Sequence, residues 1–166
     1  MSAPTIRAVS DVDIPAICEI YNHYVRASTA TFDEVESTPA DWAAKRARIE
    51  AAGIPFLIAE TDGVVCGYAL GQPWSPKAAY RRTIENSIYL DPSAAGRGVG
   101  GMLLARFLES CREAGLRQVI AVIADRGAEA SIALHRRAGF ADAGRLTDVG
   151  HKLGLELGVH LLQKSL

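Results

Sequence analysis

A glycine-rich segment between a predicted strand and a predicted helix constrains this chain more than any other feature. The segment covers residues 95–101 and has glycine at positions 96, 98, 100 and 101. Residues 84–90, before it, carry the β-branched and aromatic side chains typical of a strand. After it, apolar residues recur at the three- and four-residue spacings of an amphipathic helix, at Val99, Met102, Leu103, Phe107, Leu108 and Cys111. Such a turn lets the backbone and the first helical N–H groups approach an anion.

The spacing of the glycines narrows the kind of ligand. A P-loop has Lys and then Ser or Thr after its last glycine, whereas Met102 follows Gly101 here. A dinucleotide-binding turn follows the first strand of its unit with a different glycine spacing, whereas this turn lies in mid-chain. The residues alone therefore leave two alternatives: an anion site to which Arg97 adds a positive charge, or a tight connection that binds nothing.

The composition is that of one compact domain over residues 1–166. Hydrophobic residues make up 49% of the chain, which is enough for a substantial core. The formal net charge of −1 favours no nucleic-acid partner, and no apolar run reaches the ~20 residues of a membrane span. Cys18, Cys66 and Cys111 lie in apolar segments without disulfide or metal spacing. We therefore expect buried thiols, a cytoplasmic location and no metal.

Periodicity and turn signals predict alternating strands and helices. Strands are expected at residues 5–9, 55–60, 64–71, 84–90, 118–124, 140–147 and 159–165. Helices are expected after Ser10 and Asp13, from Thr38 to about residue 52, from about 99 to 114, and over 129–138. Asp62-Gly63 predicts a tight hairpin. This order predicts an α/β domain with a mixed sheet.

Two blocks of sequence resemble one known family. Residues 89–104 resemble the pyrophosphate loop of the GNAT-type N-acetyltransferases, in which Gln or Arg, two residues, Gly, any residue and then Gly or Ala follow in order. Gly98 and Gly100 match that pattern, whereas Ala95 replaces the Gln or Arg. Residues 130–140 are similar to the helix after the fifth strand of the superfamily, which ends in Gly-Phe, here Gly139 and Phe140.

The second block contains Ser-Ile-x-Leu-His-Arg-Arg-x-Gly-Phe, which looks like the phosphinothricin and methionine-sulfoximine acetyltransferase branch. Residues 20–32, 79–85 and 149–154 also fit this branch. The resemblance implies a single GNAT-fold domain with a mixed, mostly antiparallel, twisted sheet flanked by helices. It also implies acetyl-CoA as co-substrate, a small amino-acid-like acceptor and a homodimer.

Transfer of an acetyl group from a thioester to an amine needs a group that takes the ammonium proton, and no covalent enzyme intermediate. Strand alternation places Glu85, Ser87 and Tyr89 on one face, where a desolvated carboxylate has a raised pKa. The residue pattern alone favours an ion pair of Glu85 with Arg81 or Arg82. The branch resemblance favours Glu85 as the general base.

The resemblance also assigns expected contacts to the cofactor. His135 stands where many superfamily members have a Tyr that protonates the CoA thiolate, although a lone helical histidine is also typical of a surface or cap. Ser131, one turn earlier, is expected to hydrogen-bond the cofactor. The other expected cofactor residues, through their backbone groups, are Ile88, Tyr89, Leu90, Gly96, Arg97, Gly98, Val99, Gly100 and Gly101.

An acceptor with a carboxylate and a second polar group calls for cationic side chains and an aromatic wall. The expected substrate-binding residues are Phe32, Lys77, Tyr80, Arg81, Glu85, Asn86 and Ser87. Departures from the branch at Ser75, Ala128 and residues 155–158 leave the acceptor open. The alternatives are a non-catalytic acyl-CoA-binding or sensing domain, and an acetyltransferase for a protein N-terminus or a polyamine.

Overall fold

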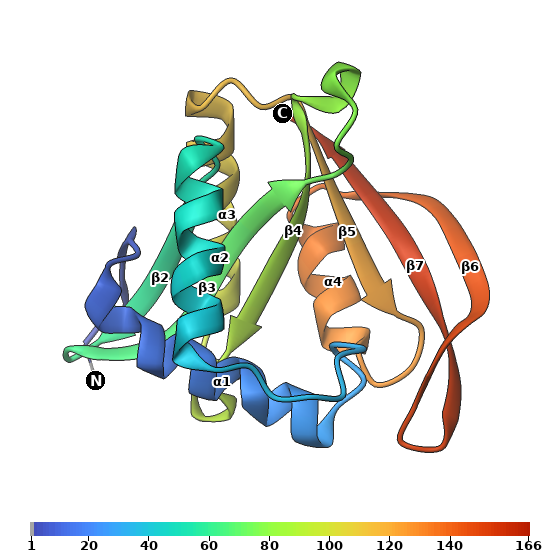
Figure 1. Cartoon of the computed structure of the whole chain (residues 1–166), viewed down its shortest axis with the longest axis horizontal. Coiled ribbons are helices and arrows are strands. Elements are labelled where there is room, and N and C mark those ends of the chain that lie inside the picture. Colours follow the sequence, from blue (N-terminus) through green and yellow to red (C-terminus); the bar gives the residue numbers. More distant parts are fainter. Residues whose placement is uncertain (1) are drawn as a thin grey trace.

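Residues 2–166 are described by a computed structural model (Figure 1). Seven strands form one sheet in the order β1-β2-β3-β4-β5-β7-β6. They are β1 (Thr5–Ala8), β2 (Phe56–Thr61), β3 (Val64–Pro73), β4 (Thr83–Leu90), β5 (Gln118–Ala124), β6 (Ala141–Lys152) and β7 (Leu155–Ser165). The helices are α1 (Ile14–Ala27), α2 (Pro39–Ala51), α3 (Val99–Glu113) and α4 (Glu129–Arg137). Only β4 and β5 pair in parallel, which confirms the mixed, mostly antiparallel sheet.

Local signals in the sequence begin the first two helices. Thr38 and Asp41 form the expected capping box, in which the Asp41 carboxylate accepts from Thr38 N–H and the Thr38 hydroxyl accepts from Asp41 N–H. A single 3-10 turn, Asp11–Asp13, stands between the Ser10 cap and α1. Arg7 donates to both carboxylate oxygens of Asp13, at 2.8 Å each, and so ties this turn to β1.

The helices form two layers, one on each face of the sheet. The face that carries Tyr68 of β3 and Tyr89 of β4 packs against α1 and α2, through edge-to-face contacts of Tyr21 and Trp42 with these rings. The opposite face, with Ile84, packs against α3 and α4. This sheet is therefore buried on both sides over its central strands (Figure 1).

Three expectations need correction. β6 ends later than the expected residue 147, and β7 begins earlier than the expected residue 159. The two strands form one long hairpin whose turn is Leu153 and Gly154. Most of β6 is solvent-exposed, so its side chains lack the alternation from which a strand is recognised. Cys18 and Cys111 are buried as expected, whereas Cys66 is partly exposed. In the part of the chain that the structure describes, no helix is long and apolar enough to cross a membrane.

Candidate active site

The candidate site lies where β4 and β5 separate. Their pairing runs only from Thr83 opposite Gln118 to Glu85 opposite Ile120. Beyond that point β4 stays paired with β3 and β5 with β7, so the two strands diverge (Figure 1). The edge of β4 that faces β5 is therefore open from Asn86 onward. An open edge presents backbone N–H and C=O groups with which an extended, peptide-like ligand can pair.

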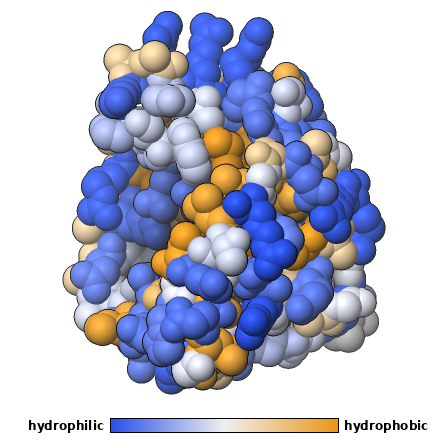
Figure 2. Space-filling model, turned by 90° about the vertical axis from the view of Figure 1, so that its right-hand side faces the viewer, coloured by the Kyte–Doolittle hydropathy of each residue, from blue (hydrophilic) through white to orange (hydrophobic). Residues whose placement is uncertain are grey.

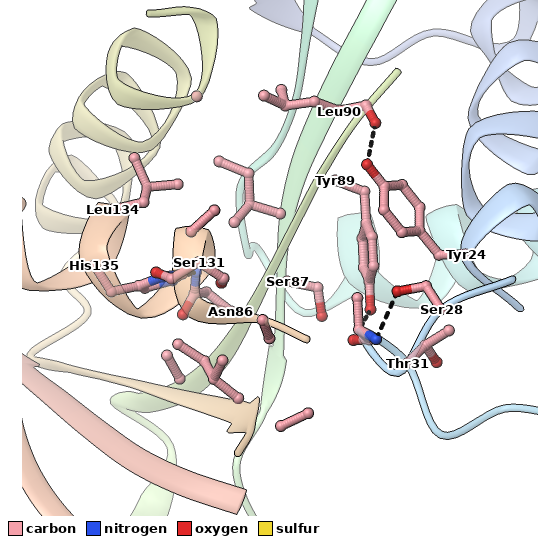
Figure 3. Close-up of a pocket in the computed structure, with 18 of the residues that line it drawn as sticks. Tyr24, Ser28, Thr31, Asn86, Ser87, Tyr89, Leu90, Ser131, Leu134 and His135 are labelled. Carbon is pink, nitrogen blue, oxygen red and sulfur yellow. Dashed lines mark hydrogen bonds between the residues drawn. The ribbon is translucent and has the colours of Figure 1, made fainter. Parts of the chain in front are cut away.

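A cavity of about 750 Å³ occupies this opening, which is within the ~300–1,000 Å³ typical of small-molecule sites. One wall is α4, with Ser131, Leu134 and His135, and the other is the loop after α1, with Ser28 and Thr31 (Figure 3). β4 forms the floor between the two walls. The glycine turn before α3 closes one end.

The glycine turn has the backbone geometry of an anion site. Gly96 and Gly98 have φ values of 73° and 79°, in the left-handed region that glycine adopts without strain, and Gly98 is the N-cap of α3. A Cβ on Gly100 would meet Leu90 at 3.3 Å and Leu134 at 3.5 Å, so glycine lets α3 pack closely. The first N–H groups of α3 have no partner within the helix. The turn residues that line the cavity are Ala95, Gly96, Gly98, Gly100 and Gly101, whereas Arg97 and Val99 do not.

Glu85 lines the cavity on the face of the sheet toward α2. Burial raises the pKa of its carboxyl group, and the ammonium of Lys45 on α2 opposes this effect in part. Neither Arg81 nor Arg82 forms an ion pair with Glu85 in the described residues 2–166, so the ion-pair interpretation is wrong. A half-buried carboxylate with a raised pKa, open to a cavity, has the properties of a general base near neutral pH.

His135 and Asn86 form a buried pair on the opposite face of β4. His135 Nδ1 lies 2.8 Å from the backbone oxygen of Ser131, which can only accept, so Nδ1 carries the proton. Nε2 therefore accepts from the Asn86 side-chain amide, at 3.1 Å. Burial lowers the pKa of His135, so the ring is neutral and its proton points into α4. The Asn86 Oδ1 atom is buried and lacks a partner among the described residues, and Asn86 lines the cavity (Figure 3).

The lowered pKa of His135 predicts a pH dependence of stability. As pH falls through the ordinary histidine pKa of 6.5, the unfolded chain binds a proton at His135 that the folded chain resists. His135 therefore lowers the free energy of unfolding by up to about 1.4 kcal/mol per pH unit in this window. His135→Gln should flatten the slope of urea-unfolding free energy between about pH 7 and pH 5. Equal slopes for wild type and His135→Gln would contradict the prediction.

Hydrogen bonds fasten the end of α1 and the loop after it to two strands, β4 and β6. The Tyr24 hydroxyl donates to the backbone oxygen of Leu90 at 2.6 Å, and the Tyr89 hydroxyl donates to that of Ala30 at 3.1 Å. Lys152 of β6 has only 2% of its surface exposed and donates to the Thr31 backbone oxygen at 2.8 Å. These bonds hold the loop as a fixed wall of the cavity.

Phe32 of this loop lies directly against Gly150 of β6. A Cβ at position 150 would overlap the Phe32 ring, so a side chain there would displace the ring from this contact. Phe32 lines the cavity and keeps 36% of its surface exposed. It therefore provides the expected aromatic wall. The sequence block at 149–154 thus supports the loop through Gly150 and Lys152.

The family model described as "Acetyltransferase (GNAT) family" matches residues 16–140 of this chain. The chain belongs to the GNAT acetyltransferase family. It is 43% identical over 164 residues to a phosphinothricin N-acetyltransferase of Alcaligenes faecalis, covering 99% of this chain and 83% of that protein. It is 39% identical over 170 residues to an L-methionine sulfoximine/L-methionine sulfone acetyltransferase of Pseudomonas paraeruginosa, covering 100% and 96%. The fold and family implied by the sequence resemblance are thereby confirmed.

Solved structures show the same fold. A GNAT superfamily phosphinothricin acetyltransferase from Sinorhizobium meliloti, crystallised in complex with acetyl-CoA, superposes with a TM-score of 0.94 at 36% identity. The match covers 99% of this chain and 89% of that one.

In this GNAT acetyltransferase, the expected site residues fall into two groups. One group lines a single cavity and consists of Phe32, Glu85, Asn86, Ser87, Ile88, Tyr89, Leu90, Ser131, His135 and the four glycines of the turn. Arg97 and Val99 of the turn do not line it. Neither do Lys77, Tyr80 and Arg81, which are exposed on the connection between β3 and β4, around the 3-10 turn Ala78–Tyr80. The structure adds Lys45, Trp42 and Tyr68, for which the sequence carried no signal beyond the helical periodicity of α2 and the strand pattern of β3.

Proposed function

We propose that this protein transfers the acetyl group of acetyl-CoA to the amino group of a small amino acid or amino-acid analogue, of the phosphinothricin or methionine sulfoximine/sulfone type. The observation that carries the proposal is the single cavity that joins the open edge of β4, the glycine turn and the half-buried Glu85. The names of the relatives support the substrate class. The two substrates would meet in one ternary complex.

The residues present fit acetyl-CoA. The backbone of Ile88, Tyr89 and Leu90 offers the open strand edge to the amide groups of the pantetheine arm. The N–H groups of residues 96–101 would hold the pyrophosphate, since these donors do not depend on the side chain missing at Ala95. Ser131 lines the same cavity and is a candidate donor to the cofactor. When bound, acetyl-CoA supplies the activated acetyl thioester.

Glu85 would act as the general base. It accepts the proton of the substrate ammonium, directly or through a water molecule, and leaves a neutral amine whose lone pair can attack the acetyl carbonyl carbon. The new C–N bond replaces the C–S bond, and CoA leaves as the thiol or thiolate. The raised pKa of Glu85 brings its basicity closer to the working pH.

His135 was expected to donate a proton to the leaving thiolate. Its hydrogen bonds favour another role, because Nδ1–H is bound to Ser131 and Nε2 accepts from Asn86. We propose that neutral His135 positions Asn86, whose free Oδ1 can accept from a ligand N–H. Ser87 and Phe32 would contact the acceptor from the floor and the wall. Roles for Lys77, Tyr80 and Arg81 in acceptor binding stay predictions.

A homodimer and a cytoplasmic location also stay predictions. The side of the molecule formed by β6 and β7 carries hydrophobic residues among hydrophilic ones (Figure 2). The large, exposed hydrophobic residues of this hairpin are Leu146, Val149, Leu153 and Leu155. Such residues are suited to a subunit contact.

A thiol-release assay with acetyl-CoA tests the proposed function. The acceptors are methionine sulfoximine, methionine sulfone, phosphinothricin, the twenty common amino acids, a polyamine and a short peptide with a free N-terminus. We expect turnover on one or more of the amino acids and amino-acid analogues. Acetyl-CoA binding without turnover on any acceptor would favour the non-catalytic alternative, and turnover on the polyamine or peptide alone would overturn the substrate class.

A further inference from the structure

Lys45 is a cation in the cavity whose ammonium no carboxylate of residues 2–166 contacts. Its Nζ lies 4.8 Å from the centre of the Trp42 ring, and its side chain lines both the large cavity and an adjoining one of about 130 Å³. Among residues 2–166 it forms neither an ion pair nor a hydrogen bond. Burial lowers the pKa of Lys45, as expected for an ammonium withdrawn from water. A desolvated cation in such a place is stabilised when an anionic ligand reaches it.

Two further donors on the same wall lack partners. Trp42 Nε1 and the Tyr68 hydroxyl are buried, and neither has a hydrogen-bond partner within the described chain. Both residues line the cavity, and their rings meet edge to face with centroids 5.3 Å apart. Native proteins leave few buried donors unsatisfied, so each such group needs an explanation. With 2% and 0% of their surfaces exposed, Trp42 and Tyr68 keep these two donors behind the surface that a ligand would touch.

The chain's own carboxylates do not fill this role. Asp33 is close enough to influence the pKa of Lys45, but it accepts a hydrogen bond from the Tyr21 hydroxyl and forms no ion pair in residues 2–166. Glu85 also influences Lys45 without contacting it. Arg48 lines the adjoining cavity together with Asp33 and Asp41, so that cavity carries charges of both signs. In the large cavity, Lys45 has no carboxylate of residues 2–166 in contact, so it can bind an anionic group of a ligand.

Lys45 and Glu85 flank one space from opposite sides. Lys45 comes from α2 and Glu85 from β4, and both line the large cavity without forming an ion pair with each other. An α-amino acid carries its ammonium and its carboxylate on the same carbon atom. When its amine lies beside Glu85, its carboxylate is available to a cation on the facing helix.

Building on the proposed function, we infer that Lys45 binds the α-carboxylate of the acceptor. Lys45 would then make the enzyme select α-amino acids over amines that lack the carboxylate. This selection differs from recognition of the acceptor side chain, which the loop with Phe32 would contact.

The test compares methionine sulfone with its α-carboxamide, which keeps the amine and the side chain but removes the negative charge. Lys45→Met should lower kcat/KM for methionine sulfone by about 10- to 100-fold, the range of a charge-assisted hydrogen bond, mainly through KM. It should change kcat/KM for the carboxamide by less than about threefold. Lys45→Arg should retain part of the preference for the carboxylate. Arg112→Met, which removes an exposed cation from α3, is the matched control and should leave kcat/KM for both substrates unchanged.

Each other outcome overturns the inference. An equal loss on both substrates would assign Lys45 a structural role, and no loss on either would remove it from acceptor binding. If the wild-type protein acetylates no amino acid at all, the proposed function fails and this inference fails with it. Turnover that does not depend on Lys45 overturns the inference alone.

Discussion

Glu85→Gln is expected to lower kcat/KM for the acceptor by about 100-fold or more near neutral pH, because general-base catalysis contributes a factor of about 10²–10⁴. In the wild type, kcat/KM should rise with pH as the Glu85 carboxyl group loses its proton. Burial raises the pKa of Glu85, so this rise lies above the ordinary glutamate value of 4.5. The measurement is a pH profile of kcat/KM at saturating acetyl-CoA.

The glutamine variant should respond to pH in a different way. Without a base, the reaction depends on the amine that has lost its proton to solvent, so the rate of the variant should keep rising toward the pKa of the amine. The difference in kcat/KM between wild type and variant should therefore become smaller at high pH. Glu109→Gln, at an exposed position on α3, is the matched control and should keep the wild-type profile. Parallel profiles for wild type and Glu85→Gln would remove Glu85 as the base.

Gly98→Ala is expected to raise the KM for acetyl-CoA by about tenfold or more, with a smaller change in kcat. Gly98 has φ 79° at the N-terminus of α3, where a Cβ strains the backbone by about 1 kcal/mol. The alanine methyl group and the shifted turn would weaken N–H contacts to the pyrophosphate, each of which is worth about 1.5–3 kcal/mol when charge-assisted. Initial rates at varied acetyl-CoA concentration give both parameters.

Gly115→Ala provides a control on the same helix. Gly115 follows the C-terminus of α3 with the same φ of 79°, and a Cβ at either glycine meets nothing within 4 Å. The two variants should therefore lose a similar free energy of unfolding in denaturant titrations. Only Gly98→Ala should raise the KM for acetyl-CoA. If both variants raise it equally, the effect comes from the stability of α3 and the turn does not bind the pyrophosphate.

Local sequence signals predicted nearly all of the secondary structure. The capping box at Thr38 and Asp41, the Asp62-Gly63 hairpin and the helical periodicity after Gly98 each act within a few residues, so each could be recognised without tertiary information. The hairpin of β6 and β7 extends further than expected, because β6 is an exposed edge strand whose pairing depends on β7 and not on its own apolar pattern.

The glycine turn and Glu85 could also be identified from the sequence, since backbone freedom and a carboxylate in an apolar strand are local properties. The sequence could not show that the turn and Glu85 line the same cavity. The cavity exists because β4 and β5 stop pairing after Glu85, and that separation depends on which strands each of them pairs with on its other side. No residue pattern within either strand predicts this separation.

Side-chain partners were decided by the tertiary structure alone. The sequence placed His135 at a family position, but the hydrogen bonds to Ser131 and Asn86 that determine its tautomer join α4 to β4. Likewise, the sequence around Lys45 is typical of a solvent-exposed helix position. In the structure, the packing of Trp42 on the sheet places Lys45 at the cavity. The sequence by itself determined the fold, the family and the candidate base Glu85, because these depend on local propensity and on short motifs. The tertiary structure decided which charges are desolvated and which donors lack partners, because burial arises only when distant segments pack together.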